Sequence, residues 1–329
     1  MNKAKEYCIR GIKSLLLPVL VYVLFALLSQ GRFGKPATML VILRQSVFPI
    51  CLAWALMPNM TMGMWDFSAG AVVYGGAIIG ANLAIATGTG IVGMIIFVIV
   101  ISVAMASLTG LLYNLLRLPS LVLSIGLCMV YEAFVSFVGD QTHIPTEMMI
   151  LSKAPWCFII FALGFVIMYL AMNKTVFGNN VKAIGANQAV AVSTGMNIAK
   201  MKQLSFSLGG LFLGVAALLF VSQSGVLLSP ASLGTLSPIF DAMMGVFIGT
   251  FLSRYCNMVI GVAIGAFTMK MLSVALIAVG LTSSVRDIIT GLFLMVLLCI
   301  SSNQGLIAHM KQQKQDAKQA NLEYEAKAS

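Results

Sequence analysis

Long apolar runs separated by short polar intervals occupy most of this sequence. A run of about 20 apolar residues is long enough to cross a bilayer as a helix. The alternation therefore predicts an all-α integral membrane protein with about ten transmembrane helices, some of them broken or half-helices. The predicted spans lie at residues 14–30, 41–60, 67–87, 91–116, 119–139, 156–172, 204–223, 236–252, 257–279 and 286–303.

The second and third predicted spans are expected to be irregular. Pro58 and the polar stretch PNMTMGMWDFS separate them, and several glycines follow from Gly70 onward. Non-helical backbone at membrane depth persists only where it is packed inside protein or lines a wet cavity. We therefore expect residues 58–70 to lie in the protein interior.

Composition agrees with a protein dissolved in lipid. The 329 residues are 60% hydrophobic and 9% charged, with a mean hydropathy of +0.98, whereas soluble domains carry about 25% charged residues. The net charge of +10 comes without a basic patch interleaved with aromatic residues, so nucleic-acid binding is not expected. Six scattered cysteines without CxxC spacing predict neither a disulfide framework nor a metal site.

The basic residues predict the topology. Most of the 20 lysines and arginines fall in the segments that share a side with the N-terminus, and an excess of positive charge marks the cytoplasmic side. The chain then divides into a cytoplasmic segment 1–13, a transmembrane domain 14–303 and a cytoplasmic tail 304–329. The polar interval 173–203 is expected on the cytoplasmic side as well.

Motifs for catalysis are missing from the sequence. His143 and His309 are the only histidines and are expected on opposite sides of the membrane. There is no HExxH, GxSxG or GxxxxGK[ST], and GTGIVG at 88–93 follows no strand, so it is interpreted as a turn. The chain is not expected to be an enzyme or to hold a cofactor. An ion-coupled secondary transporter and an importer driven by a separate ATPase both remain open.

The interval from Asn173 to Lys202 distinguishes these two classes of transporter, since it carries four lysines and no acidic residue. Its core, ANQAVAVSTGMNIAKMK, predicts a short helix that Asn187 caps and that Gly195 ends by adopting a positive φ. Such a helix suits docking to a motor protein. A basic loop held by anionic lipid headgroups is the alternative interpretation.

The same residues resemble a known pattern. FGNNVKAIGANQAVAVSTGMNIAKMK is similar to the cytoplasmic loop of the ribose-type, or simple-sugar, permeases of bacterial ABC importers. MTMGMWDFSAGAVV and FDAMMGVFIG resemble two further family motifs, with Asp66 and Asp241 in register. The resemblance runs over about residues 40–305. One departure is that Arg254, Tyr255 and Cys256 stand where the family has glycines.

The resemblance implies the membrane-spanning subunit of an ATP-driven importer in the bacterial inner membrane. It implies a small polar solute, most simply a monosaccharide, although relatives serve nucleosides or branched-chain amino acids. Implied partners are a second permease copy, identical or not, a cytoplasmic ATPase that carries ATP and Mg²⁺, and an extracytoplasmic solute-binding protein. The residues implied to couple this loop to the ATPase are Gly185, Asn187, Gln188, Ala189, Gly195, Lys200 and Lys202.

Four charged residues are candidates for the translocation path or its gates. The resemblance points to Asp66 and Asp241, each of which could instead cap a broken helix. Glu132 and Lys270 are chosen by depth, because each lies about 13 residues into its span, or roughly 18–20 Å from the cytoplasmic end. We predict that they form an intramembrane ion pair. Alternatively, each faces the aqueous path or reaches outward to the membrane surface.

Overall fold

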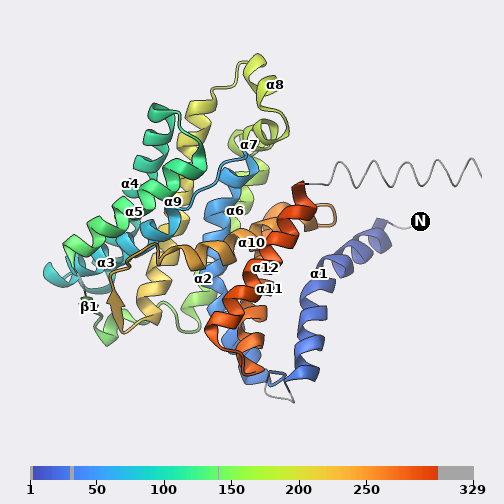
Figure 1. Cartoon of the computed structure of the whole chain (residues 1–329), viewed down its shortest axis with the longest axis horizontal. Coiled ribbons are helices and arrows are strands. Elements are labelled where there is room, and N and C mark those ends of the chain that lie inside the picture. The colour runs from blue at the N-terminus through green and yellow to red at the C-terminus, as the bar shows by residue number, and fades with distance from the viewer. Residues whose placement is uncertain (1–2, 30–32, 140, 303–329) are drawn as a thin grey trace, which may run out of the picture. The chain divides into compact units, whose positions relative to one another are not determined.

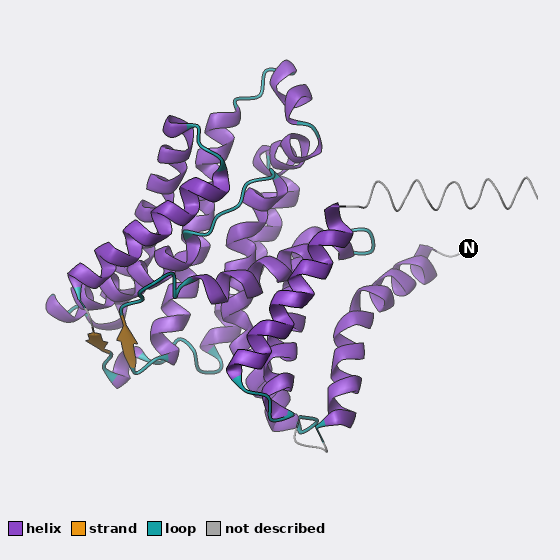
Figure 2. Cartoon of the chain, in the orientation of Figure 1, coloured by secondary structure: helices purple, strands orange, loops and turns teal. Residues whose placement is uncertain are grey.

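The computed structural model describes residues 3–29, 33–139 and 141–302. Apart from one pair of three-residue strands, the regular secondary structure of these residues is helical, which confirms the all-α class (Figures 1 and 2). The helices are α1 Lys3–Leu28, α2 Pro36–Thr61, α3 Ala69–Ala86, α4 Gly90–Leu116, α5 Ser120–Val138, α6 Trp156–Lys174, α7 Val176–Ala186, α8 Gln188–Ser193, α9 Ile198–Gln223, α10 Leu236–Leu252, α11 Met258–Ala278 and α12 Ser283–Ser302. The strands are β1 Gln141–His143 and β2 Val226–Leu228, paired antiparallel, and a 3-10 turn covers Thr146–Met148.

Each of the ten predicted spans coincides with one of these helices. Within the described residues, α2, α3, α4, α5, α6, α9 and α11 are long and apolar enough to cross a membrane. Ser14–Leu28 of α1 and the whole of α10 are apolar but shorter. The multi-pass membrane architecture is therefore confirmed, whereas the number ten is only approximate.

The described residues divide into two compact units, one ending at residue 281 and the other beginning at residue 282. The first contains α1 to α11. In the second, the structure describes α12, and the predicted tail 304–329 lies outside the described residues.

The prediction that the second and third spans are irregular is wrong. Helix α2 runs unbroken through Pro49 and Pro58, and α3 is continuous as well. Helix α2 is held on several sides by α9, α11, α10 and α6, and this packing keeps the helix intact although each proline removes one backbone donor. The backbone is irregular only between the two helices, where Met64, Asp66 and Ser68 are buried, so the expected interior position of this stretch is confirmed.

Small residues set the closest helix contacts. A Cβ at Gly245 or Gly249 of α10 would press on Ala266 or Val262 of α11, and Gly210 and Gly214 of α9 approach the backbone of α4 equally closely. Small-xxx-small steps let helix backbones approach in this way in lipid. These glycines therefore allow the close packing of α10 on α11 and of α9 on α4.

Trp54 lies at the centre of this packing and is fully buried. Its ring stacks on Phe161 of α6 at 5.6 Å and meets Phe212 of α9 edge-on at 6.1 Å. Its indole N–H donates to the carbonyl of Val259 at 3.1 Å, at the start of α11. One side chain of α2 therefore joins three neighbouring helices.

Candidate functional site

The polar interval forms two short helices, α7 and α8, at the end of the bundle opposite the β1–β2 pair (Figure 1). Asn187 caps α8, because its side-chain oxygen accepts from the N–H groups of Ala189 at 3.0 Å and Val190 at 3.2 Å. Helix α8 ends at Ser193, and Gly195 takes a φ of +83°. The predicted short helix, with its cap and its glycine stop, is confirmed.

Helix α7 rests on the end of α2. Val181 and Ile184 are buried, and a Cβ on Gly185 would overlap the carbonyl oxygen of Thr61, the last residue of α2. Only glycine lets the two backbones come this close. The structure thus gives Gly185 a packing role between the polar interval and α2.

A second contact ties the interval to α6 and α11. Asn173 at the end of α6 and Asn257 at the start of α11 exchange side-chain amide hydrogen bonds of 3.2 and 3.0 Å. Lys182 of α7 donates to the same oxygen of Asn173 at 3.2 Å. Helix α7 is therefore linked to three membrane-spanning helices, which are α2, α6 and α11.

The start of α9 carries two further lysines of the interval, Lys200 and Lys202. Lys202 is half-buried, and its ammonium group lies 4.8 Å from the ring centre of Tyr113 in α4, a cation–π contact. Lys200 is exposed. Lys202 thus packs within the bundle, while Lys200 remains accessible.

Helix α8 presents apolar side chains to the outside. Val190 and Val192 are each 56% exposed, whereas Ala191 between them is buried. Gln188 and Ala189 are exposed too. These exposed apolar side chains are available for contact with a partner protein, and the helix carrying them is fixed at its base by the contacts of α7.

Asp66 lies in the irregular segment between α2 and α3 and is 3% exposed. Its Oδ1 accepts from the N–H of Ser68 at 3.1 Å and from the hydroxyl of Ser68 at 2.6 Å. Burial raises the pKa of the carboxyl, and the bonds from Ser68 and Ala69 act in the opposite direction. These contacts place the carboxylate at the start of α3, in the manner of a helix cap.

A line of hydroxyl groups continues from Asp66 into the bundle. The Ser68 hydroxyl lies 3.4 Å from that of Thr109 in α4, and Thr109 lies 3.1 Å from the hydroxyl of Tyr131 in α5. Tyr131 also donates to the carbonyl of Met105 at 3.0 Å. These hydroxyl groups therefore connect the start of α3 with α4 and α5.

Glu132 is 4% exposed and binds the segment that precedes α10. One oxygen accepts from the N–H of Leu233 at 2.8 Å, and the other accepts from the N–H and the hydroxyl of Thr235 at 3.0 and 2.7 Å. Ser232 and Leu233 have φ values of 55° and 63°, which are uncommon for residues with a Cβ. The carboxylate thus holds a turn in an unfavourable backbone conformation.

The turn has a tight contact on one side and open space on the other. The carbonyl of Thr235 packs so closely on Gly70 of α3 that a Cβ there would overlap it. A cavity of about 210 Å³ lies beside Glu132, lined also by Ser136 and Ser232. The segment before α10 is therefore held between α3 and Glu132, with room to move toward the cavity.

The predicted pair of Glu132 with Lys270 remains a prediction. The hydrogen bonds from Leu233 and Thr235 occupy both oxygens of Glu132. Helix α5 packs mainly on α3, and α11 packs mainly on α10 and α2. Asp241 in α10 and Lys270 in α11 are each half-buried. Asp66 and Glu132 bind different partners, since Asp66 accepts from Ser68 and Glu132 accepts from Leu233 and Thr235.

Sequence reasoning missed the partners of Glu132 and the Asn173–Asn257 pair. The stretch SPASLGT before α10, rich in small, proline and glycine residues, is a signal for irregular backbone that could have located the turn. The asparagine pair leaves no comparable local signal.

Comparison with known proteins supports this architecture. Residues 38–298 match the family described as "Branched-chain amino acid transport system / permease component". The chain is 26% identical to the "Autoinducer 2 import system permease protein LsrC" of Enterobacter sp. (strain 638), over 75% of this chain and 74% of that protein. It is 23% identical to the protein of the same name from Yersinia pestis (strain Pestoides F), over 87% of this chain and 82% of that protein.

No solved structure matches the chain. The family match covers most of the sequence, and seven of the described helices are long and apolar enough to cross a membrane. The chain therefore belongs to the family of membrane-spanning permease components of ABC importers.

Proposed function

We propose that this permease carries a monosaccharide or a similar sugar-like solute inward across the bacterial inner membrane. The relatives named above import autoinducer 2, which supports a small solute of this kind. The description of the family favours a second candidate, a branched-chain amino acid. Family membership also argues against the ion-coupled alternative.

In this proposal a separate ATPase subunit, carrying ATP and Mg²⁺, drives transport by docking on α8. The observation that carries the proposal is the exposure of Val190 and Val192 on α8, which follows directly on α7, the helix that contacts α2, α6 and α11. A rigid base lets a push on α8 move membrane-spanning helices. Docking of the ATPase shifts the permease between its two states only if the ATPase contacts those two states differently.

The complete importer in this proposal has a second permease copy, either identical or different, and an extracytoplasmic binding protein. In this proposal the N-terminus, the C-terminal tail and α8 of the permease lie in the cytoplasm. The β1–β2 pair lies on the outer side of the membrane. The distribution of lysine and arginine supports this orientation.

The test is uptake by the importer assembled from this chain, its ATPase and its binding protein in proteoliposomes. We expect ATP-dependent uptake of labelled ribose in preference to leucine, and the reverse order would select the amino-acid candidate. Uptake driven by a proton or sodium gradient with this chain alone would refute the ABC mechanism.

The docking surface is tested by placing a charge on it. Val190→Asp is expected to abolish ATP-dependent uptake and ATPase binding, because a carboxylate in an apolar contact must be desolvated without a partner. Val176→Asp is the matched control, since Val176 is 74% exposed at the start of α7. Equal loss in both variants would show that α8 is not the docking element.

A further inference from the structure

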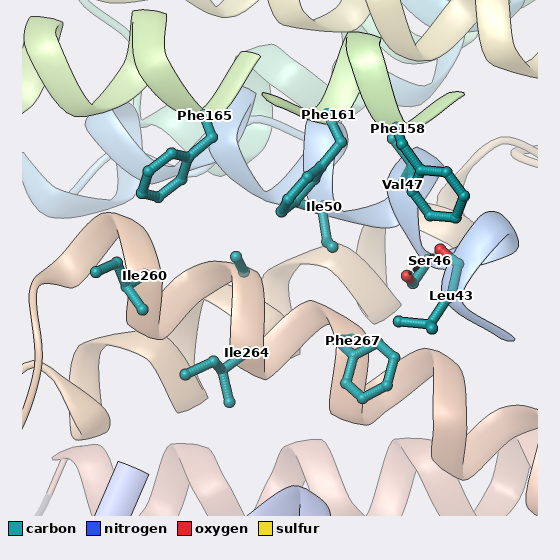
Figure 3. Close-up of a pocket in the computed structure, with 11 residues that line it drawn as sticks. Leu43, Ser46, Val47, Ile50, Phe158, Phe161, Phe165, Ile260, Ile264 and Phe267 are labelled. Atoms are coloured by element: carbon teal, nitrogen blue, oxygen red, sulfur yellow. Dashed lines mark hydrogen bonds between the residues drawn. The ribbon is translucent and has the colours of Figure 1, made fainter. Parts of the chain in front are cut away.

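An apolar groove runs between α2, α6 and α11 (Figure 3). It has a volume of about 470 Å³. Phe158, Phe161 and Phe165 of α6 form one wall, and Ile260, Ile264 and Phe267 of α11 form the wall that faces them. Helix α2 contributes the floor with Leu43, Ser46, Val47 and Ile50. The groove is therefore built from three membrane-spanning helices and opens along their sides.

The groove follows the direction of the helices. Leu43, Phe158 and Phe267 lie at one end, and Phe165 and Ile260 lie at the other (Figure 3). The seven steps from Phe158 to Phe165 rise about 10 Å along the helix axis. An acyl chain of a lipid leaflet lies in this same direction.

The groove offers no polar partner along its length. Among its lining residues Ser46 is the only polar one, and its hydroxyl donates to the carbonyl of Leu43 at 2.8 Å. Polar groups that are already paired make no demand on an occupant. The interior of the groove therefore matches a hydrocarbon chain.

A positively charged residue lies near the end of the groove that Leu43 lines. Arg44 follows the lining residue Leu43, is half-buried, and neighbours Cys157 at the start of α6. Its Nε is buried and has no hydrogen-bond partner among the described residues. A guanidinium at the membrane is costly unless an anion meets it, and its planar donors fit a phosphate well.

We propose that this groove and Arg44 form a binding site for an anionic phospholipid. The phosphate contacts Arg44, and one acyl chain fills the groove between α6 and α11. The charge at one end and the hydrocarbon lining beyond it match the two parts of such a molecule. A second protein copy would fill the groove with side chains and would leave Arg44 in need of an acidic partner.

The test measures lipid binding by the purified full chain with native mass spectrometry. Phosphatidylglycerol is titrated against phosphatidylcholine of the same chain length. The wild type is expected to prefer phosphatidylglycerol. Arg44→Gln should reduce that preference about tenfold, the size expected from losing one charged hydrogen bond, and Arg44→Lys should retain part of it. Lys153→Gln is the matched control, since Lys153 is an exposed basic residue just before α6.

The chain half of the site is tested separately. Ala263 of α11 lines the groove, and Ala263→Phe should reduce binding of both lipids by filling it. Ala104→Phe, at an exposed position of α4, should leave binding unchanged. The proposal is overturned if Arg44→Gln binds like the wild type, if Lys153→Gln loses the preference equally, or if Ala263→Phe keeps full binding. Loss of a dimer in Ala263→Phe with lipid binding intact would assign the groove to a second copy.

Discussion

Replacing Glu132 by glutamine is expected to loosen the segment before α10 without unfolding the protein. Glutamine keeps one acceptor oxygen and puts an NH₂ group in place of the other. In the wild type, one oxygen of Glu132 accepts from the N–H of Leu233, and the other accepts from the N–H and the hydroxyl of Thr235. In the variant, the NH₂ group replaces one of these two oxygens. At least one buried donor therefore loses its acceptor.

The magnitude follows from these contacts. A hydrogen bond to a charged group contributes about 1.5–3 kcal/mol. Left-handed backbone at Ser232 and Leu233 costs about 1–2 kcal/mol per residue. The turn therefore relaxes when the hydrogen bonds to residue 132 are weakened. A local loss of about 2 kcal/mol raises the open population roughly 30-fold. The cavity of about 210 Å³ beside Glu132 gives the segment space to open into.

Hydrogen–deuterium exchange of the chain in nanodiscs measures this opening. Peptides covering residues 230–235 should exchange roughly 30-fold faster in Glu132→Gln, while peptides from α8 keep the wild-type rate. Glu147→Gln is the control, because Glu147 is an exposed carboxylate in the 3-10 turn. Unchanged exchange at 230–235 would refute the role of Glu132 in holding the turn.

A charge swap tests the predicted pair of Glu132 and Lys270. If the pair exists, Glu132→Lys and Lys270→Glu each impair expression or transport, and the double variant recovers part of the loss. A double variant as poor as the worse single one would assign the two residues to separate sites.

Three further predictions concern the polar interval and its side of the membrane. Gly185→Ala should lower transport, and overpacking should lower the free energy of unfolding by about 1–3 kcal/mol. Gly126→Ala is the control, because Gly126 has open space for a Cβ, and it should leave both transport and the melting temperature unchanged. Gly195→Val should uncouple ATPase activity from uptake with membrane insertion intact, because its φ of +83° disfavours β-branched residues, and Gly195→Asn should retain coupling. In a cysteine-free background, an impermeant thiol reagent added from outside should label Lys153→Cys and miss Lys200→Cys, and labelling of both would contradict the topology.

Local properties of the sequence determined the membrane class, the approximate position of each predicted span and the form of α8. Apolar length decides whether a segment crosses a bilayer, and the caps at Asn187 and Gly195 act within a few residues of chain. Each of these features could be predicted because the residues responsible are neighbours in the sequence. Helix α9 starts at Ile198, before the apolar run, because Asn197 caps a polar first turn by accepting from Lys200.

Contacts between distant residues were decided only by the tertiary structure. Glu132 and Leu233 are 101 residues apart, and Asn173 and Asn257 are 84 apart. The continuity of α2 through Pro58 likewise depends on the helices packed around it. An apolar run shows that a helix lies in the membrane. In lipid all faces of such a helix are nearly equally apolar, so the apolar pattern does not specify which helices become neighbours. Close packing of small residues and the pairing of buried polar groups make that choice, and both exist only once the bundle has formed.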